Sequence, residues 1–248
     1  MLKLFKKKTS LQLSTKETVD IIESAVAPYL KENGFKKHGR TYCRFVDNDI
    51  AQVVNFQNGC AAKGVTGILW INLGIRVPEC VERKFKDLPP LKKYYHEYEC
   101  NIRCVLGELT PDKNDGYDLT NNPEKIAKDI IKNLKKYAMP VFDKLNSREN
   151  ILLYRRDHRK FDWLSHLRIF EEAMIYGKMG DIEKATDLFN THYSISVEEI
   201  RSQREINGET ICGSRIWSTP NFNHIDYLEE LADELEIRII KPLDRNHL

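Results

Sequence analysis

The sequence predicts an α+β fold: a four-stranded antiparallel sheet with helices on one face, followed by a mostly helical module. Three observations lead to this fold class. Apolar residues recur at helical spacing after Ser14, four segments of alternating residues follow between positions 40 and 109, and only helical spacing occurs beyond residue 150. An order of helix, four strands and helix favours an antiparallel sheet with its helices on one face.

The first element is a helix over residues 14–34. Ser14 and Glu17 have the spacing of a capping box, in which each side chain satisfies the other residue's backbone N–H. Pro28 is expected to kink this helix, and Gly34 stands where a helix stop belongs. The apolar row that repeats every three or four residues consists of Val19, Ile22, Val26 and Leu30.

Four strands and a second helix are predicted next. The strands are expected at residues 40–46, 50–57, 68–77 and 98–109. Between the third and fourth strands the alternation breaks, and Pro89 with Pro90 excludes regular structure there. Pro123 lies near the start of a helix that runs to Tyr137, with its apolar residues on one side.

The remaining sequence predicts helices. Residues 166–193 have the pattern of two helices joined at GKMGD, and their small and aromatic residues match the spacing of one tetratricopeptide-like hairpin. Ser196 and Glu199 are expected to cap a further helix, and a last helix begins at Asn223 or His224 and runs to about Glu236. We therefore divide the chain into an α+β domain, residues 1–148, and a helical module, residues 149–248.

Part of the chain resembles a known family. The segments GFKKHGRTYCRF, IAQVVNFQ, WINLGI and CNIRCVLGEL occur in the order seen in the bacterial family called domain of unknown function 4304. The resemblance covers roughly residues 15–145, and VVNFQ followed by INLGI is its most specific part. It implies a cytoplasmic bacterial α+β domain, and it supplies neither an activity nor catalytic residues.

Composition and charge disfavour several classes of protein. A net charge of +2 gives no strong field to attract nucleic acid, and no apolar run approaches the roughly 20 residues that cross a bilayer. The basic start, MLKLFKKKTS, lacks the apolar stretch of a secretory signal. Six cysteines without a CxxC pair fit reduced thiols, so we expect a cytoplasmic protein. No motif predicts a cofactor, a metal site or catalytic residues, since HExxH, GxSxG and glycine-rich phosphate loops are absent from the sequence.

The candidate site is the polar face of the predicted sheet. If the apolar rows face the helices, the opposite face collects aromatic, amide and arginine side chains. Trp, Tyr and Arg are the residues that most often anchor protein interfaces, and amides offer both donors and acceptors. The predicted binding residues are Tyr42, Arg44, Asn55, Gln57, Trp70, Asn72, Arg76, Asn101 and Arg103.

Three hypotheses explain such a face. The first is a binding module that engages another protein or peptide, for which an immunity or antitoxin-like role would be suitable. The second is an interface within the chain, in which the helical module covers the face. The third is a hydrolase-type enzyme with a pocket near Glu99 and Arg103 or His96. The sequence leaves the partner's identity and the oligomeric state open.

Overall fold

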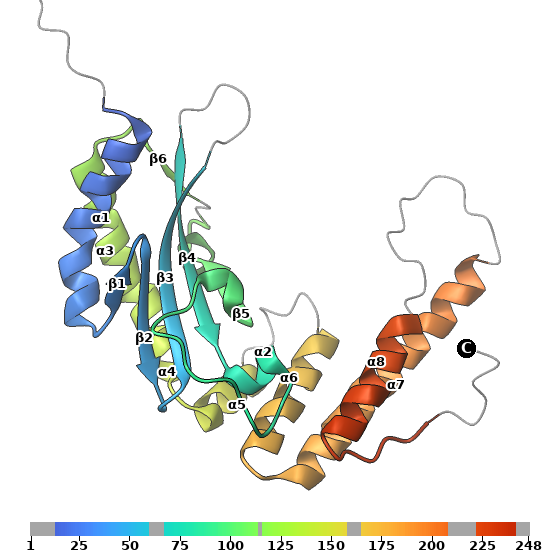
Figure 1. Ribbon diagram of the computed structural model, residues 1–248. Coiled ribbons are helices and arrows are strands. Elements are labelled where there is room, and N and C mark those ends of the chain that lie inside the picture. The colour runs from blue at the N-terminus through green and yellow to red at the C-terminus, as the bar shows by residue number, and fades with distance from the viewer. Residues whose placement is uncertain (1–12, 60–66, 114–115, 158–164, 208–221, 242–248) are drawn as a thin grey trace, which may run out of the picture. The chain divides into compact units, whose positions relative to one another are not determined.

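The computed structural model describes residues 13–59, 67–113, 116–157, 165–207 and 222–241 (Figure 1). The chain divides into two compact units. Unit 1 contains residues 1–76 and 92–143, and unit 2 contains residues 77–91 and 144–248. The α+β class predicted from the sequence is confirmed. The predicted count of four strands is wrong, since the described part of the chain forms a sheet of six strands.

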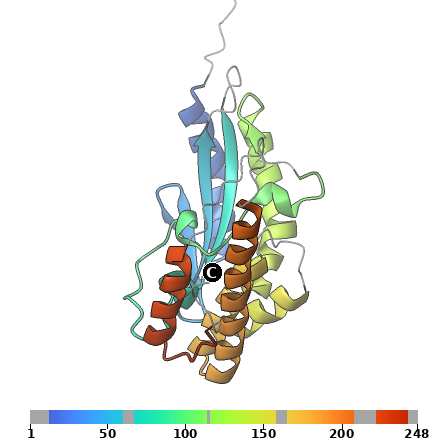
Figure 2. The ribbon, with the colours of Figure 1, turned by 90° about the vertical axis from the view of Figure 1, so that its right-hand side faces the viewer.

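Unit 1 is built on that antiparallel sheet, with the strand order β1-β2-β3-β4-β5 and with β6 paired to β4. The long strands β3 and β4 lie side by side in both views (Figure 2). The strands are β1 (Lys36–His38), β2 (Thr41–Val46), β3 (Ile50–Gly59), β4 (Ile68–Arg76), β5 (Ile102–Val105) and β6 (Tyr117–Asp118). The helices are α1 (Thr15–Glu32), η1 (Glu97–Glu99), η2 (Leu106–Leu109), α3 (Pro123–Asn133), η3 (Leu134–Ala138) and α4 (Met139–Lys144).

Helix α1 begins where its sequence indicates. The Ser14 side chain accepts a hydrogen bond from the Glu17 N–H, and the Glu17 carboxylate accepts one from the Ser14 N–H. The predicted apolar row is fully buried, and α1 packs beside α3 (Figure 1). Pro28 does not end the helix, which continues to Glu32. The buried row of α1 thus forms one layer of the core of unit 1.

The predicted fourth strand is much shorter than its alternation suggested. Of residues 98–109, only those of β5 pair with β4, and the residues before and after β5 form the short 3-10 helices η1 and η2. The strands β1 and β6 were not predicted, because three and two residues are too few to show alternation. The sheet therefore gains two short strands and loses most of one long strand.

Unit 2 is helical. Its elements are α2 (Pro78–Glu82), α5 (Arg148–Asp157), α6 (Ser165–Lys178), α7 (Ile182–Asn207) and α8 (Phe222–Glu234). Helix α2 lies in the segment where the sequence predicted no regular structure, and Pro78 occupies its first turn. Helices α6 and α7 pack against each other as the hairpin pattern indicates. Ser196 does not cap a helix, because it lies buried within α7.

The segment 77–91 packs with the residues that follow position 143. One edge of the Arg148 guanidinium group meets a carboxylate here: Nε and Nη2 each donate a hydrogen bond of 2.8 Å to Glu79. Glu79 is fully buried, and Cys80 beside it donates to the Glu171 carbonyl. The two-bond ion pair fixes α2 on α5.

Candidate functional site

The strand register decides which predicted binding residues share a face. Residues opposite each other on antiparallel strands project to the same side of the sheet. Asn55 pairs with Asn72, Gln57 with Trp70, and Gly74 with Arg103. Six predicted residues therefore lie on one side, which we call the second face: Asn55, Gln57, Trp70, Asn72, Arg76 and Arg103. Asn101 precedes β5, so strand alternation assigns it to neither side.

Tyr42 and Arg44 lie on the opposite side, the helix face, and the sequence-based assignment of these two residues was wrong. Tyr42 pairs with Val54 and Arg44 with Gln52, residues that face α1 and α4. Tyr42 is completely buried and donates a 3.0 Å hydrogen bond to Glu23 of α1. Burial raises the pKa of Tyr42, and the Glu23 carboxylate raises it further.

The Arg44 guanidinium holds three parts of unit 1 together. It donates to Gln52 Oε1 at 2.8 Å, to the Asn33 carbonyl at 2.9 Å and to Asp143 at 3.1 Å. Its carbon lies 4.7 Å from the centre of the Phe35 ring. Through these contacts Arg44 joins β2 to the ends of α1 and α4. Arg44 is therefore a structural residue.

One end of the second face is covered by residues 92–100 of the same unit. Tyr95 and Cys100 pack on Cys43, Ala51 and Val53 to form a small apolar cluster. This cluster makes the covered end part of the core.

Two further residues of the sheet belong to this covered end. Arg76 is 3% exposed, and its guanidinium lies 4.2 Å from the centre of the Tyr95 ring. Gly74 permits the close approach, because a Cβ there would lie 2.7 Å from Cys100 Sγ. Arg76 is therefore part of this packing and not of an exposed site.

Glu99 and His96 hold the covering segment in shape. The Glu99 carboxylate accepts hydrogen bonds from the His96 N–H at 2.8 Å and from Lys92 Nζ at 2.6 Å. Partial burial raises the pKa of Glu99, but the His96 N–H and the Lys92 ammonium outweigh it and leave that pKa below its ordinary value. Glu99 is thus an ionised capping group for η1.

The five remaining residues of the second face form what we call the polar-aromatic surface: Asn55, Gln57, Trp70, Asn72 and Arg103. Gln57 and Arg103 are exposed and the other three are half-buried. The Trp70 ring lies over Gly59, where a Cβ would come within 2.4 Å of it. Asn55 Nδ2 donates to Thr41 Oγ1 at 2.9 Å, which fixes its amide. Packing and hydrogen bonds therefore orient this surface before any ligand arrives.

An amide pair lies at the centre of this surface. Asn72 Nδ2 donates a 2.6 Å hydrogen bond to Gln57 Oε1 on the neighbouring strand. Within the described residues, the Asn72 Oδ1 and the Gln57 Nε2 have no further partner. The pair therefore presents one acceptor and one donor side by side, next to the Trp70 ring.

Comparison with protein families identifies most of unit 1, together with residues 77–91 of unit 2. The model of the family described as domain of unknown function (DUF4304) matches residues 26–144. Residues 26–144 belong to the DUF4304 family. No curated protein and no solved structure matches the chain. The resemblance in the sequence is confirmed, and the DUF4304 match includes every residue of the polar-aromatic surface.

The DUF4304 domain also contains a row of four contacting rings, two stacked pairs joined by an edge contact, that was not predicted from the sequence. His38 stacks on Tyr94 with ring centres 4.3 Å apart, and His96 stacks on Tyr98 at 5.0 Å. Tyr94 meets the edge of His96 and so joins the two pairs. The sequence does contain a signal for this row. Tyr94, His96 and Tyr98 occur at every second position, and alternate residues of an extended chain share a side.

The described cysteines of the DUF4304 domain are not activated nucleophiles. Cys43, Cys80, Cys100 and Cys104 are free thiols, and burial raises the pKa of each. A thiolate, not a thiol, is the reactive species. Cys60 lies outside the described residues, as does Cys212 of unit 2. Among the residues that are described, no group of three His, Cys, Asp or Glu side chains could hold a metal ion.

Among the described residues, no helix combines the length and the apolar composition that crossing a bilayer requires.

Proposed function

We propose that the DUF4304 domain is a non-catalytic binding module that engages another polypeptide through the polar-aromatic surface. The observation that carries this proposal is the Asn72–Gln57 pair, with one acceptor and one donor turned to no protein group among the described residues. A peptide group offers the complementary donor and acceptor. The two amides can therefore hydrogen-bond the main chain of a partner.

The neighbours of the amide pair suit the same role. Trp70 offers a rigid ring that rests on Gly59, so little side-chain freedom is lost when a partner covers it. Arg103 is an exposed residue of β5 and supplies a charged contact at the border of the surface. Trp and Arg are enriched among residues that dominate binding energy at protein interfaces.

The chemistry of the adjoining segment favours binding over hydrolysis. Glu99 was the acid–base candidate of the enzyme hypothesis. Its carboxylate accepts hydrogen bonds from Lys92 and from the His96 N–H, and both bonds stabilise the segment around η1. A general acid or base near neutral pH needs a carboxyl pKa raised toward 7, whereas the pKa of Glu99 is lowered. The free thiols of the domain suit a reducing compartment, so we place this binding activity in a bacterial cytoplasm, where an immunity or antitoxin-like role is one suitable use.

A site-specific photo-crosslinker tests the proposal. We would introduce benzoyl-phenylalanine at position 103, on the polar-aromatic surface, and at Ser24, an exposed position of α1, as the matched control. After irradiation of cells that contain the full chain, position 103 should give one discrete adduct with a second polypeptide. Asn72→Ala should reduce that adduct at least fivefold, because it removes the amide pair.

Two outcomes contradict the proposal. Equal adducts from positions 103 and 24 would show that contact is non-specific. A product with the mass of a single chain, linked from position 103 to residues 149–248, would support the intramolecular alternative in place of a partner.

A further inference from the structure

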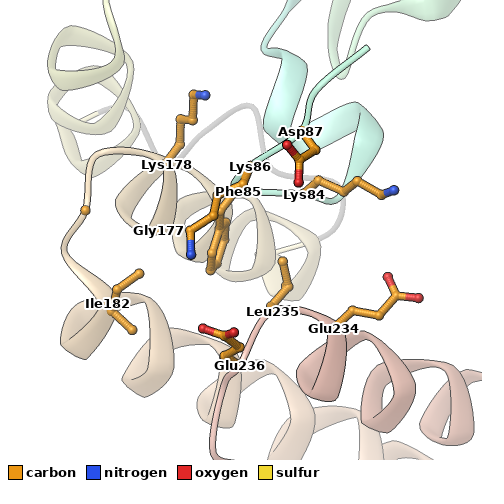
Figure 3. Close-up of a pocket in the computed structure, with 11 residues that line it drawn as sticks. Lys84, Phe85, Lys86, Asp87, Gly177, Lys178, Ile182, Glu234, Leu235 and Glu236 are labelled. Carbon is orange, nitrogen blue, oxygen red and sulfur yellow. The ribbon is translucent and has the colours of Figure 1, made fainter.

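Unit 2 contains a cavity of about 750 Å³ that the sequence analysis did not anticipate (Figure 3). Its walls come from the segment after α2, the end of α6, the start of α7 and the end of α8. This volume lies within the range of roughly 300 to 1,000 Å³ that is usual for sites of small organic ligands. The cavity is independent of the polar-aromatic surface, because all its lining residues belong to unit 2.

The base of the cavity is apolar. Phe85 and Leu235 are buried, whereas Ile182 of α7 is 43% exposed, and all three line the same space (Figure 3). The Phe85 ring lies directly against Gly177, where a Cβ would come within 2.2 Å of its Cζ. Glycine at this position therefore seats the aromatic ring against α6, and the ring forms a fixed apolar surface.

The rim of the cavity carries both signs of charge. All six of its charged residues are exposed, and none of them forms an ion pair with another described residue. Figure 3 shows them on different sides of the apolar base. The cationic residues are Lys84, Lys86 and Lys178, and the anionic ones are Asp87, Glu234 and Glu236.

The backbone at Glu236 is unusual when the helix ends are compared. Helices α1, α6 and α8 all end with the same two hydrogen bonds, a Schellman motif, made in α8 by Ile237 N to Ala232 O at 2.8 Å and Glu236 N to Asp233 O at 3.2 Å. The left-handed residue is glycine in α1 and α6, at Gly34 and Gly180. In α8 it is Glu236, at φ 57°, whose side chain lines the cavity.

Asp87, a second carboxylate of the rim, also has a positive φ, of 51°. Non-glycine residues rarely adopt this conformation, since it costs about 1 kcal/mol or more. Both carboxylates thus belong to residues in the left-handed backbone conformation, which extended and helical residues do not adopt.

We infer that this cavity binds a short peptide that carries an apolar side chain between a positive and a negative charge. The apolar side chain contacts Phe85, Leu235 and Ile182. The positive group pairs with Asp87 or Glu236, and the negative group pairs with the lysines. A simple anion or cation would match only half of the rim and would be repelled by the other half.

Four blocked tripeptides test this inference on the full chain. Acetylated and amidated Lys-Phe-Glu, Lys-Phe-Lys, Glu-Phe-Glu and Ser-Phe-Ser share phenylalanine and differ in the residues that flank it, and so in charge. Titration calorimetry should show Lys-Phe-Glu binding at least tenfold more tightly than each of the other three. Glu236→Gln and Lys86→Gln should each weaken its binding about fivefold to tenfold.

Matched controls separate the rim from charge in general. Glu230→Gln on α8 and Lys184→Gln on α7 change exposed residues that do not line the cavity, and binding should be unchanged. Equal affinity for all four peptides, or no binding of Lys-Phe-Glu at millimolar concentration, would overturn the inference. Either result would leave the crosslinking test of the DUF4304 domain unaffected.

Discussion

Arg44 and Arg103 show how two arginines of one sheet can have opposite roles. Both were predicted for the same face, because both alternate with apolar neighbours. Alternation within a strand shows that two faces differ, but it does not show which of them meets the helices. That choice depends on the turn between β2 and β3, where Asp47 and Asn48 have positive φ and Val46 pairs with Ile50. Arg44 thereby reaches α1 and α4, whereas Arg103 stays exposed.

The two arginines give a direct stability test. Arg44→Ala should lower the free energy of unfolding by about 2 to 3 kcal/mol, because it leaves the Asn33 carbonyl and Gln52 without their charged donor. Arg103→Ala should change it by less than about 0.5 kcal/mol, as for an exposed side chain. Urea unfolding followed by circular dichroism measures both. Similar losses in the two variants would contradict the face assignment.

At the scale of elements, the sequence predicted what is long and periodic. Helix α1 and strands β2, β3 and β4 were found because each contains enough residues to show its period. The strand predicted over residues 98–109 was too long, because alternation cannot distinguish a strand from an extended segment interrupted by 3-10 turns. Ser196 and Glu199 have capping-box spacing, but the buried row of α7 continues past them through Val197. Tertiary burial overrode the local signal.

The candidate sites were predictable to different extents. Strand parity predicted the polar-aromatic surface correctly at the level of a shared face, because Asn55, Asn72 and Trp70 lie on two long, adjacent strands. It could not predict that residues 92–100 cover Arg76, since this depends on contacts distant in sequence. No local sequence pattern predicts the cavity in unit 2, because its lining residues come from four separate segments of the chain.

The end of α8 provides a test at this scale. Glu236→Gly should raise the free energy of unfolding by about 0.5 to 1 kcal/mol, because glycine adopts the left-handed conformation without steric cost. Gly180→Ala, at the equivalent position of α6, should lower it by about 1 kcal/mol for the same reason. Thermal unfolding of the two variants beside the natural chain compares them. A loss of stability in Glu236→Gly would mean that the Glu236 side chain makes a stabilising contact.

The whole molecule contains four free cysteines among its described residues, and their burial makes its stability sensitive to alkaline pH. Burial, with a smaller effect of Cys43, raises the pKa of Cys100 from 9.0 to about 12. Above pH 9 the unfolded chain loses this proton while the folded chain retains it. The stabilisation is therefore complete below pH 9 and is lost as the pH rises toward 12.

We accordingly expect the free energy of unfolding to fall between pH 9 and pH 10.5, with Cys100 contributing about 1 to 2 kcal/mol of that fall. Cys100→Ala should have a correspondingly shallower pH dependence, although its stability at pH 7 is lower by the cost of a small cavity. Urea unfolding at pH 7, 9 and 10.5 gives the slopes. Parallel slopes for the variant and the natural chain would show that Cys100 titrates alike in both states.

The ion pair between Glu79 and Arg148 has a consequence for synthesis on the ribosome. Domains generally fold as units, the N-terminal one first as the chain emerges. Here residues 77–91 emerge early, yet the groups that satisfy Glu79 and cover Cys80 and Phe85 lie at Arg148, Glu171 and Gly177. Until about 100 more residues have been translated, the Glu79 carboxylate and the Phe85 ring therefore lack these partners and stay in contact with solvent. Unit 2 can be completed only late in translation, so this early segment stays exposed in the nascent chain while the residues that will cover it are synthesised.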